Sequence, residues 1–210
     1  MKDLYRYIIK IGQGKTDSNH NYIESDDFDK VYQYINTIAD QEAIDNFNKN
    51  LLPLLVTYMT NNSLTTLLDN PKVTVNHLYS FGKIIEVGDD IYMELIKIIA
   101  QSPLKFKTLL KNGLNINKNF PAIRISIYHR ERKSMSLIEY IKFLIDRDDN
   151  SDFAIGINLL NVLVELGYNK YEILNDEEIT KIKEKYDYYV HIVHSIENIT
   201  MISNIKPTNI

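Results

Sequence analysis

The hydrophobic residues of this chain recur mostly every three or four positions, a spacing that places them on one face of a helix. The segment 4–11 is richer in aromatic and β-branched residues and fits either a short strand or a first helix. Pro53 interrupts the pattern of 41–58 and predicts a break there. Residues 61–63 are expected to form a turn with an N-cap, and the acidic residues 146–152 a loop. The predicted helices span 26–38, 41–58, 64–68, 75–87, 91–100, 104–112, 136–145, 153–166 and 177–199, and because little strand remains, the predicted fold class is all-α.

One short pattern recurs at the ends of these predicted helices. Leu109–Asn117 reads Leu-Leu-Lys-Asn-Gly-Leu-Asn-Ile-Asn, in which an apolar pair closes a helix. Gly113 can then take the left-handed conformation that ends it. A second copy in the same register covers 163–169, and a weaker third copy covers 84–90. We therefore interpret the chain as a helical repeat.

The repeat leads to two structural expectations. Leu110 and its counterpart Val164 should face a core that is shared between stacked helix pairs. Gly113 and Gly167 should have positive φ angles at the ends of their helices.

A helix, a short turn and a second helix ending in Leu-Leu-x-x-Gly-x-Asn-x-Asn resemble the ankyrin repeat. The resemblance covers about residues 75–170, where 91–100 would pair with 104–112 and 136–145 with 153–166. It implies a solenoid, because one helix pair alone does not bury its apolar face. The alternative is an unrelated helical bundle whose helices end at glycines.

The chain departs from the ankyrin pattern in two respects. The separations from Gly88 to Gly113 and from Gly113 to Gly167 are 25 and 54 residues, whereas a regular array repeats about every 33. The Thr-Pro-Leu-His sequence that opens the first helix is reduced to Met-Ser-Leu-Ile at 135–138, where only the leucine matches.

The repeat divides the chain into three expected parts. Residues 1–74 would form an N-terminal helical region packed on the repeats as a cap, and residues 75–174 the ankyrin-like helix pairs. Residues 175–210 would form a C-terminal capping helix and tail.

Composition restricts the class of partner. The chain has 210 residues, a net charge of −4 and a pI near 5.7, so we expect no general attraction to nucleic acid or to an anionic membrane. The absence of cysteine excludes disulfides and thiolate metal sites. No signal peptide or membrane-spanning run is visible, and we expect a cytoplasmic location, either in the producing cell or in a host cell.

Three local patterns resemble known binding sites, but each fits its site poorly. The segment 11–16 ends like a phosphate-binding loop, but Ile9 stands where the first glycine is needed. His191 and His194 share a helix face in a stretch better suited to the edge of a core than to a metal. The acidic residues 146–152 lack the glycine turn and late glutamate of a calcium loop. We therefore expect neither a metal nor a cofactor.

The segment 124–133, Arg-Ile-Ser-Ile-Tyr-His-Arg-Glu-Arg-Lys, concentrates positive charge. Polar and apolar residues alternate from 123 to 128, as they do in a strand, which favours a long hairpin between helix pairs; the other interpretation is a solvated loop. Basic and aromatic residues together suit an acidic protein surface, and RNA less well. The expected partner-binding residues are Arg124, Tyr128, His129, Arg130 and Arg132.

These patterns favour a non-enzymatic protein–protein interaction module, such as a pathogen effector or an antagonist of a toxin or host factor. One alternative is an all-α bundle that inhibits its partner through a groove. Another is an enzyme with a site scattered in sequence, for example His77 with Asp89 or Asp90. No nucleophile elbow, metal quartet or glycine cradle is visible in the sequence, which argues against the enzyme.

Overall fold

The computed structural model describes residues 2–13, 25–80, 99–124, 132–147, 149–169 and 173–185. These residues are mostly helical, which confirms the all-α prediction, and they include one short antiparallel hairpin. The chain separates into two compact units, 1–166 and 167–210. In the part of the chain that the structure describes, no helix is long and apolar enough to cross a membrane.

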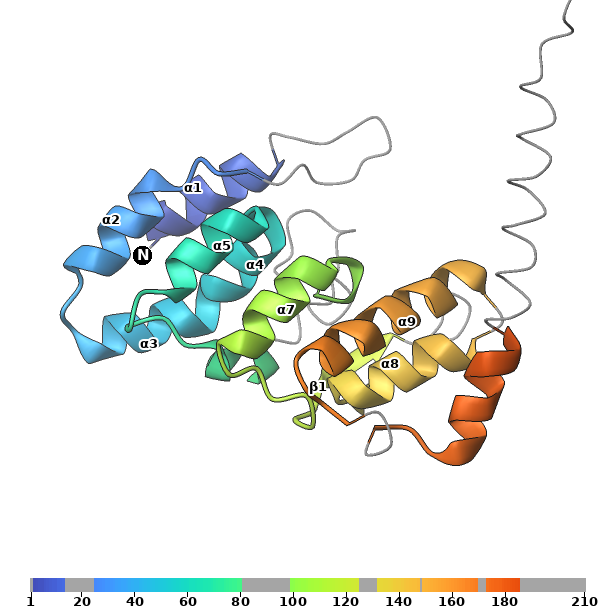
Figure 1. Cartoon of the computed structure of the whole chain (residues 1–210). Coiled ribbons are helices and arrows are strands. Elements are labelled where there is room, and N and C mark those ends of the chain that lie inside the picture. The colour runs from blue at the N-terminus through green and yellow to red at the C-terminus, as the bar shows by residue number, and fades with distance from the viewer. Residues whose placement is uncertain are drawn as a thin grey trace, which may run out of the picture. The chain divides into compact units, whose positions relative to one another are not determined.

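Five helices form the N-terminal part of the first unit (Figure 1). They are α1 (Lys2–Gln13), α2 (Asp29–Thr37), α3 (Gln41–Asn50), α4 (Leu52–Tyr58) and α5 (Asn61–Leu68). The segment 4–11 is thus helical, and the predicted break at Pro53 is confirmed, because this proline lies in the first turn of α4. The expected turn at 61–63 is wrong. The Thr60 hydroxyl accepts a hydrogen bond from the Ser63 N–H, so α5 begins one residue after Thr60.

The rest of the first unit contains the hairpin, the α-helices α7, α8 and α9, and two short helical segments. Its elements are the 3₁₀ helix η1 (Val75–Ser80), the helical residues 99–101, α7 (Pro103–Lys111), β1 (Phe120–Arg124), β2 (Arg132–Met135), α8 (Leu137–Asp146) and α9 (Asn150–Glu165). The predicted helix 75–87 is therefore 3₁₀ in its described part. The acidic loop is shorter than expected, because the Asp149 carboxylate caps α9 by accepting from the N–H groups of Ser151 and Asp152.

Helix α4 is the centre of the N-terminal core, and all of its residues are buried. It packs against α1, α3 and η1. Lys105 of α7 also reaches this core: it is 1% exposed, and its Nζ donates to the Thr57 carbonyl oxygen at 3.4 Å. The buried amine therefore links α7 to α4.

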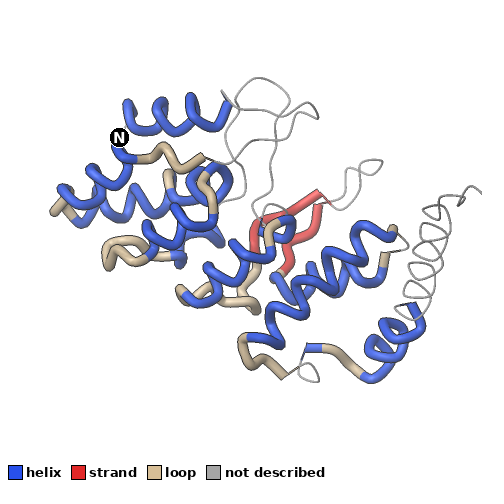
Figure 2. Tube along the Cα trace, turned by 45° about the horizontal axis from the view of Figure 1, so that its top comes forward, coloured by secondary structure: helices blue, strands red, loops and turns tan. Residues whose placement is uncertain are grey.

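Helices α5, α7 and α9 pack against one another in that order, and α8 packs on α9 (Figures 1 and 2). Lys107 of α7 and Glu165 of α9 form an ion pair at 2.7 Å. Helices α8 and α9 approach closely at Gly156, where a Cβ atom would lie 2.8 Å from Ile145 Cγ1 and 3.2 Å from its backbone nitrogen. Any larger residue at Gly156 would press these two helices apart.

The repeated helix ends have the predicted backbone conformation. Gly113 has φ +91° and Gly167 has φ +89°, which confirms both expectations. After α7, the Gly113 N–H donates to the Leu110 oxygen and the Leu114 N–H to the Leu109 oxygen, the two bonds of a Schellman cap.

The side-chain prediction for the repeated helix ends is half right. Leu110 is buried, but Val164 is 45% exposed, so the expectation that both face a shared core is wrong for Val164. In α9 the buried position is the preceding Leu163. One residue turns a helix by about 100°, which is enough to bring the next side chain into solvent.

The loop 69–74 is held to α2 and α3 by polar contacts. The Lys72 amine donates to three carbonyl oxygens at the end of α2, those of Ile35, Asn36 and Ile38, at 3.1, 3.1 and 2.6 Å. Asn48 of α3 is 1% exposed. Its side chain donates to the Lys72 oxygen at 2.8 Å and accepts from the Thr74 N–H at 2.9 Å. These contacts satisfy backbone groups that the loop leaves unpaired.

Asp26 connects the start of α2 to the start of α5. Its carboxylate accepts hydrogen bonds from the hydroxyls of Thr60 and, at 2.5 Å, Ser63. The neighbouring Ser25 forms a parallel bridge with Met59. The hydrogen bonds from Ser63 and then Thr60 lower the pKa of Asp26 below its usual 3.8.

We expect Asp26 to make folding stability depend on acidity. A carboxyl whose pKa is lower in the folded state stabilises the fold above its unfolded pKa, and this contribution is lost as the pH falls through the folded value. Asp26→Asn should therefore be less stable than the parent at neutral pH. The difference should begin to shrink as the pH falls below 3.8, the usual pKa of an aspartate, and should be lost once the pH falls through the lower folded value. Urea unfolding of both proteins across this range measures it, and a difference that is independent of pH would contradict the assignment.

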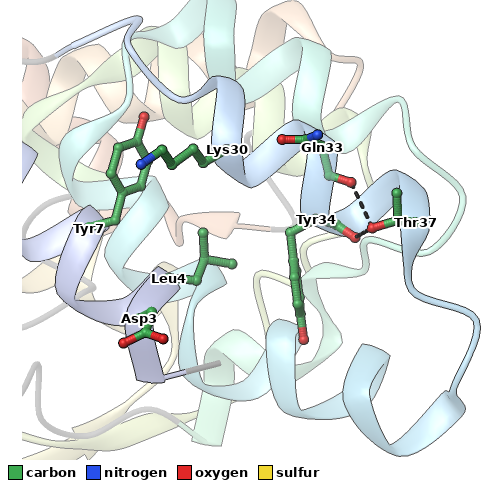
Figure 3. Close-up of a pocket in the computed structure, with 7 residues that line it drawn as sticks. All are labelled: Asp3, Leu4, Tyr7, Lys30, Gln33, Tyr34 and Thr37. Atoms are coloured by element: carbon green, nitrogen blue, oxygen red, sulfur yellow. Dashed lines mark hydrogen bonds between the residues drawn. The ribbon is translucent and has the colours of Figure 1, made fainter.

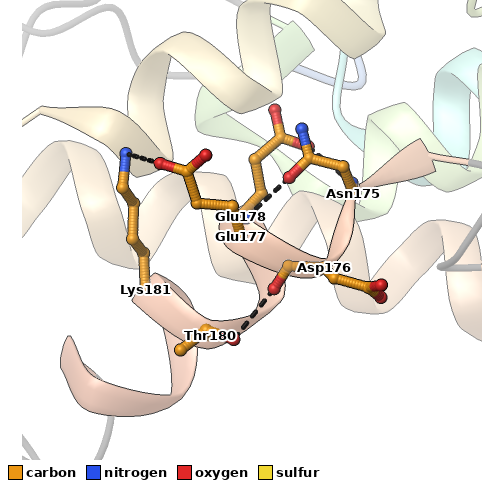
Figure 4. Close-up of polar contacts among 6 residues, drawn as sticks. All are labelled: Asn175, Asp176, Glu177, Glu178, Thr180 and Lys181. Atoms are coloured by element: carbon orange, nitrogen blue, oxygen red, sulfur yellow. Dashed lines mark hydrogen bonds and ion pairs between the residues drawn. The ribbon is translucent and has the colours of Figure 1, made fainter.

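The described part of the second unit is a short helical segment. Residues 176–185 are helical, and the Asn175 side chain accepts from the Glu178 N–H at 2.8 Å while the Glu178 carboxylate accepts from the Asn175 N–H at 2.8 Å (Figure 4). This reciprocal pair caps the helix. Lys181 and Glu177 add an exposed ion pair at 3.3 Å.

Candidate functional site

The β1–β2 hairpin is inserted between α7 and α8, and its base is part of the core. Phe120 and Met135 are partners across the two strands, and both are buried. The Ser134 hydroxyl donates to the Phe120 oxygen at 2.7 Å. The Phe120 ring lies 5.2 Å from the ring of Tyr79 in η1, at an interplanar angle of 57°. The hairpin base is therefore fixed to the helices around it.

Tyr79 also organises the loop that leads from α7 to the hairpin. Its hydroxyl oxygen accepts a hydrogen bond from the Asn115 N–H, and the Lys118 amine lies 4.7 Å from the centre of its ring. The Asn115 side chain in turn accepts from the Asn117 N–H at 2.9 Å. The two asparagines of the repeated pattern, Asn115 and Asn117, therefore lie in a tight loop that leaves α7.

The described strands bring two of the predicted binding residues together. Arg124 is paired with Arg132, and Ile123 with Lys133. Paired positions with like charge are unfavourable for strand pairing, so the pair concentrates positive charge at a cost to the hairpin itself. Tyr128, His129 and Arg130 lie outside the described residues.

A second candidate surface is a groove of about 440 Å³ between α1 and α2, which the sequence did not indicate (Figure 3). Leu4 lies between the rings of Tyr7 and Tyr34 (Figure 3). The groove is lined by Asp3, Leu4 and Tyr7 of α1 and by Lys30, Gln33, Tyr34 and Thr37 of α2. On each helix the lining includes residues three or four positions apart, such as Leu4 and Tyr7 or Lys30 and Tyr34, so a helical face was the signal available in the sequence.

The two tyrosines of the groove are held in place by contacts with neighbouring residues. The Tyr7 hydroxyl donates to the backbone carbonyl oxygen of Asp27 at 2.7 Å. The Lys30 amine lies 5.0 Å from the centre of the Tyr7 ring. The Tyr34 ring stacks on Phe47 of α3 at 6.2 Å. Burial, with smaller contributions from the carboxylates of Asp27 and Asp29, raises the pKa of Tyr7, so its hydroxyl stays protonated. The groove walls are thus preorganised.

The other sequence candidates do not form a site in the part of the chain that the structure describes. His77 lies in η1, whereas Asp89, Asp90, His191 and His194 lie outside the described residues, as does Gly14–Thr16 of the phosphate-loop pattern. Among the residues with described positions, no three His, Cys, Asp or Glu side chains are grouped so as to hold a metal ion.

Comparisons with known proteins give no further indication of function. No protein family model, no curated protein and no solved structure matches this chain. Its function must therefore be inferred from its own residues.

Proposed function

We propose that this chain is a non-enzymatic protein-binding module, built as a divergent ankyrin-like helical repeat, and that the β1–β2 hairpin recognises the partner. The partner is another protein with an acidic surface. An effector, or an antagonist of a toxin or host factor, would act in this way. The observation that carries the proposal is a pair of arginine positions on a hairpin whose base is anchored in the core.

The packing of α5, α7 and α9 supports the repeat. Each helix ends on an apolar pair: Leu67–Leu68 in α5, Leu109–Leu110 in α7 and Leu163–Val164 in α9. Five of these six residues are buried, and Val164 is the exception. In a solenoid, helices at equivalent positions of consecutive repeats pack against each other. The packing of α5 on α7 and of α7 on α9 is consistent with such an arrangement.

The hairpin is well placed for recognition. An insertion into a helical repeat is best tolerated where it projects from the stack, and such loops often carry binding residues. Arginine pairs with carboxylates through two parallel hydrogen bonds, and a fixed hairpin base reduces the entropy lost on binding.

We expect the double change Arg130→Glu and Arg132→Glu to abolish binding to the physiological partner and to leave the thermal stability almost unchanged. Repulsion from an acidic surface opposes association, whereas exposed charges in general contribute little to folding. Binding of the parent should also weaken as salt rises. Affinity purification from the native cell type with mass spectrometry identifies the partner, and titration of the purified pair measures the effect.

The matched control changes the net charge equally on helices α3 and α7, outside the hairpin. Lys49 and Lys111 are both exposed, and their replacement by glutamate should leave binding nearly intact. Full binding by the hairpin variant, or its failure to fold, would contradict the proposed role of the arginines.

The α1–α2 groove favours a second candidate, an inhibitor that binds its partner through a groove. Its apolar floor, aromatic walls and polar rim resemble the composition of many interaction surfaces. Lys30 and Gln33 lie on the rim and are exposed. Changing both to glutamate should weaken binding if the groove is used and should have no effect if the hairpin is used. The same titration, run beside the hairpin variant, therefore separates the two candidates.

A further inference from the structure

Strand β2 has an open edge in the described part of the structure. The sheet has two strands, so β2 pairs with β1 on one side and with no described strand on the other. A row of unpaired N–H and C=O groups on a strand edge is a template for an added strand. The segment Arg132–Met135 contains no proline and no extra residue, so its edge is uninterrupted.

The edge of β1 is a poorer template. Pro121 has no N–H to donate, and the register is irregular between Phe120 and Ile123, where β1 carries one more residue than β2. Proline and bulges are features that protect strand edges from pairing. An incoming strand would therefore add to β2.

The charge of β2 identifies the kind of segment that it would accept. Arg132 and Lys133 are consecutive, and consecutive strand positions lie on opposite faces of a sheet. A neighbouring strand would meet a positively charged position on each face, and Arg124, paired with Arg132, adds a third. Opposite charges across a pair of strands stabilise the pairing.

We propose that β2 binds an extended acidic segment of the partner protein as a third strand, with carboxylate residues at adjacent positions opposite Arg132 and Lys133. This inference rests on the proposed function and specifies how the partner is recognised. The backbone of the segment pairs with the β2 edge, and its two carboxylates select for the charge of the hairpin.

The test uses the full chain and an octapeptide of two Val-Glu-Glu-Thr repeats. Backbone amide hydrogen exchange, followed by NMR, reports on each strand separately. We expect at least one amide of residues 132–135 to exchange about tenfold more slowly at a peptide concentration about ten times the dissociation constant. The amides of β1 should be unaffected, because they do not face the added strand.

Two control peptides separate backbone pairing from charge. Proline in place of each threonine keeps the charge but removes N–H donors, and it should abolish the protection. Lysine in place of each glutamate keeps the backbone but should not bind. The variant Arg132→Gln with Lys133→Gln should also lose the protection, while unchanged exchange in α9 shows that it remains folded.

Each result decides a different point. If the proline peptide binds as tightly as the threonine peptide, and no β2 amide is protected, strand addition is wrong although an acidic partner remains supported. If neither acidic peptide binds at low salt, the inference is overturned, and Arg132 and Lys133 instead protect the edge from pairing. Failure of the proposed function would appear separately, as undiminished partner binding by the Arg130→Glu, Arg132→Glu variant.

Discussion

Replacing Leu109 with alanine should lower the free energy of unfolding by about 2–5 kcal/mol, because the change leaves a cavity in a packed core. Leu109 is fully buried in α7, the helix that packs against both α5 and α9. Leu110, with 8% exposure, should give a loss in the lower part of the same range. Chemical denaturation with a two-state fit measures both changes.

Leu104 provides the matched control on the same helix. It is 64% exposed, and its replacement by alanine should change the stability by no more than about 0.5 kcal/mol. Equal effects at Leu104 and Leu109 would show that α7 is not packed between α5 and α9 as described.

Replacing Asn48 with alanine should lower the free energy of unfolding by about 2–4 kcal/mol. The change removes the side chain that bonds to two backbone groups of the loop 69–74. The Lys72 oxygen and the Thr74 N–H would each lose a hydrogen bond at a site where the asparagine is 1% exposed. Thermal or urea unfolding measures the loss. Faster amide exchange at Thr74 would locate it.

Asn46→Ala is the corresponding control for Asn48. Asn46 lies on the same helix and is exposed, and its side chain bonds only to Asn50 among the contacts described. We expect a change within about 0.5 kcal/mol. If Asn48→Ala is equally mild, water replaces the lost hydrogen bonds and the loop does not depend on the side chain.

Local signals in the sequence predicted the helix ends well. Gly113 and Gly167 adopt the positive φ expected at a helix C-terminus, and Pro53 separates α3 from α4. These outcomes depend on the backbone preferences of single residues, which do not change with the surroundings. Boundaries set by capping side chains were harder to predict, because residues 60–63 offer several polar caps and only Thr60 is used.

Burial was predicted less well, because periodicity identifies a helix face without showing what covers it. Val164 was expected in the core and is exposed, whereas Lys105 is buried against α4 despite its charge. Asp26 lies at the start of the predicted helix 26–38, yet its carboxylate bonds to Thr60 and Ser63, more than 30 residues away. Such contacts depend on the tertiary arrangement.

The hairpin was predicted in part. Alternation of polar and apolar residues indicated strands in the basic segment, and β1 and β2 lie on its two sides. The pairing of Arg124 with Arg132 required the register, which a sequence alone does not fix. The α1–α2 groove was not predicted, because its lining comes from two helices that the chain joins through a long connection.

The short junction between β2 and α8 couples the hairpin to the helix pair α8–α9. A single residue, Ser136, separates the strand from the helix, and it is locked by reciprocal hydrogen bonds with Glu139. Helix α8 in turn fits against α9 at Gly156, where there is no room for a side chain. If the proposed partner displaces the hairpin, the displacement would pass through this single capped residue to α8 and, through the close contact at Gly156, to α9.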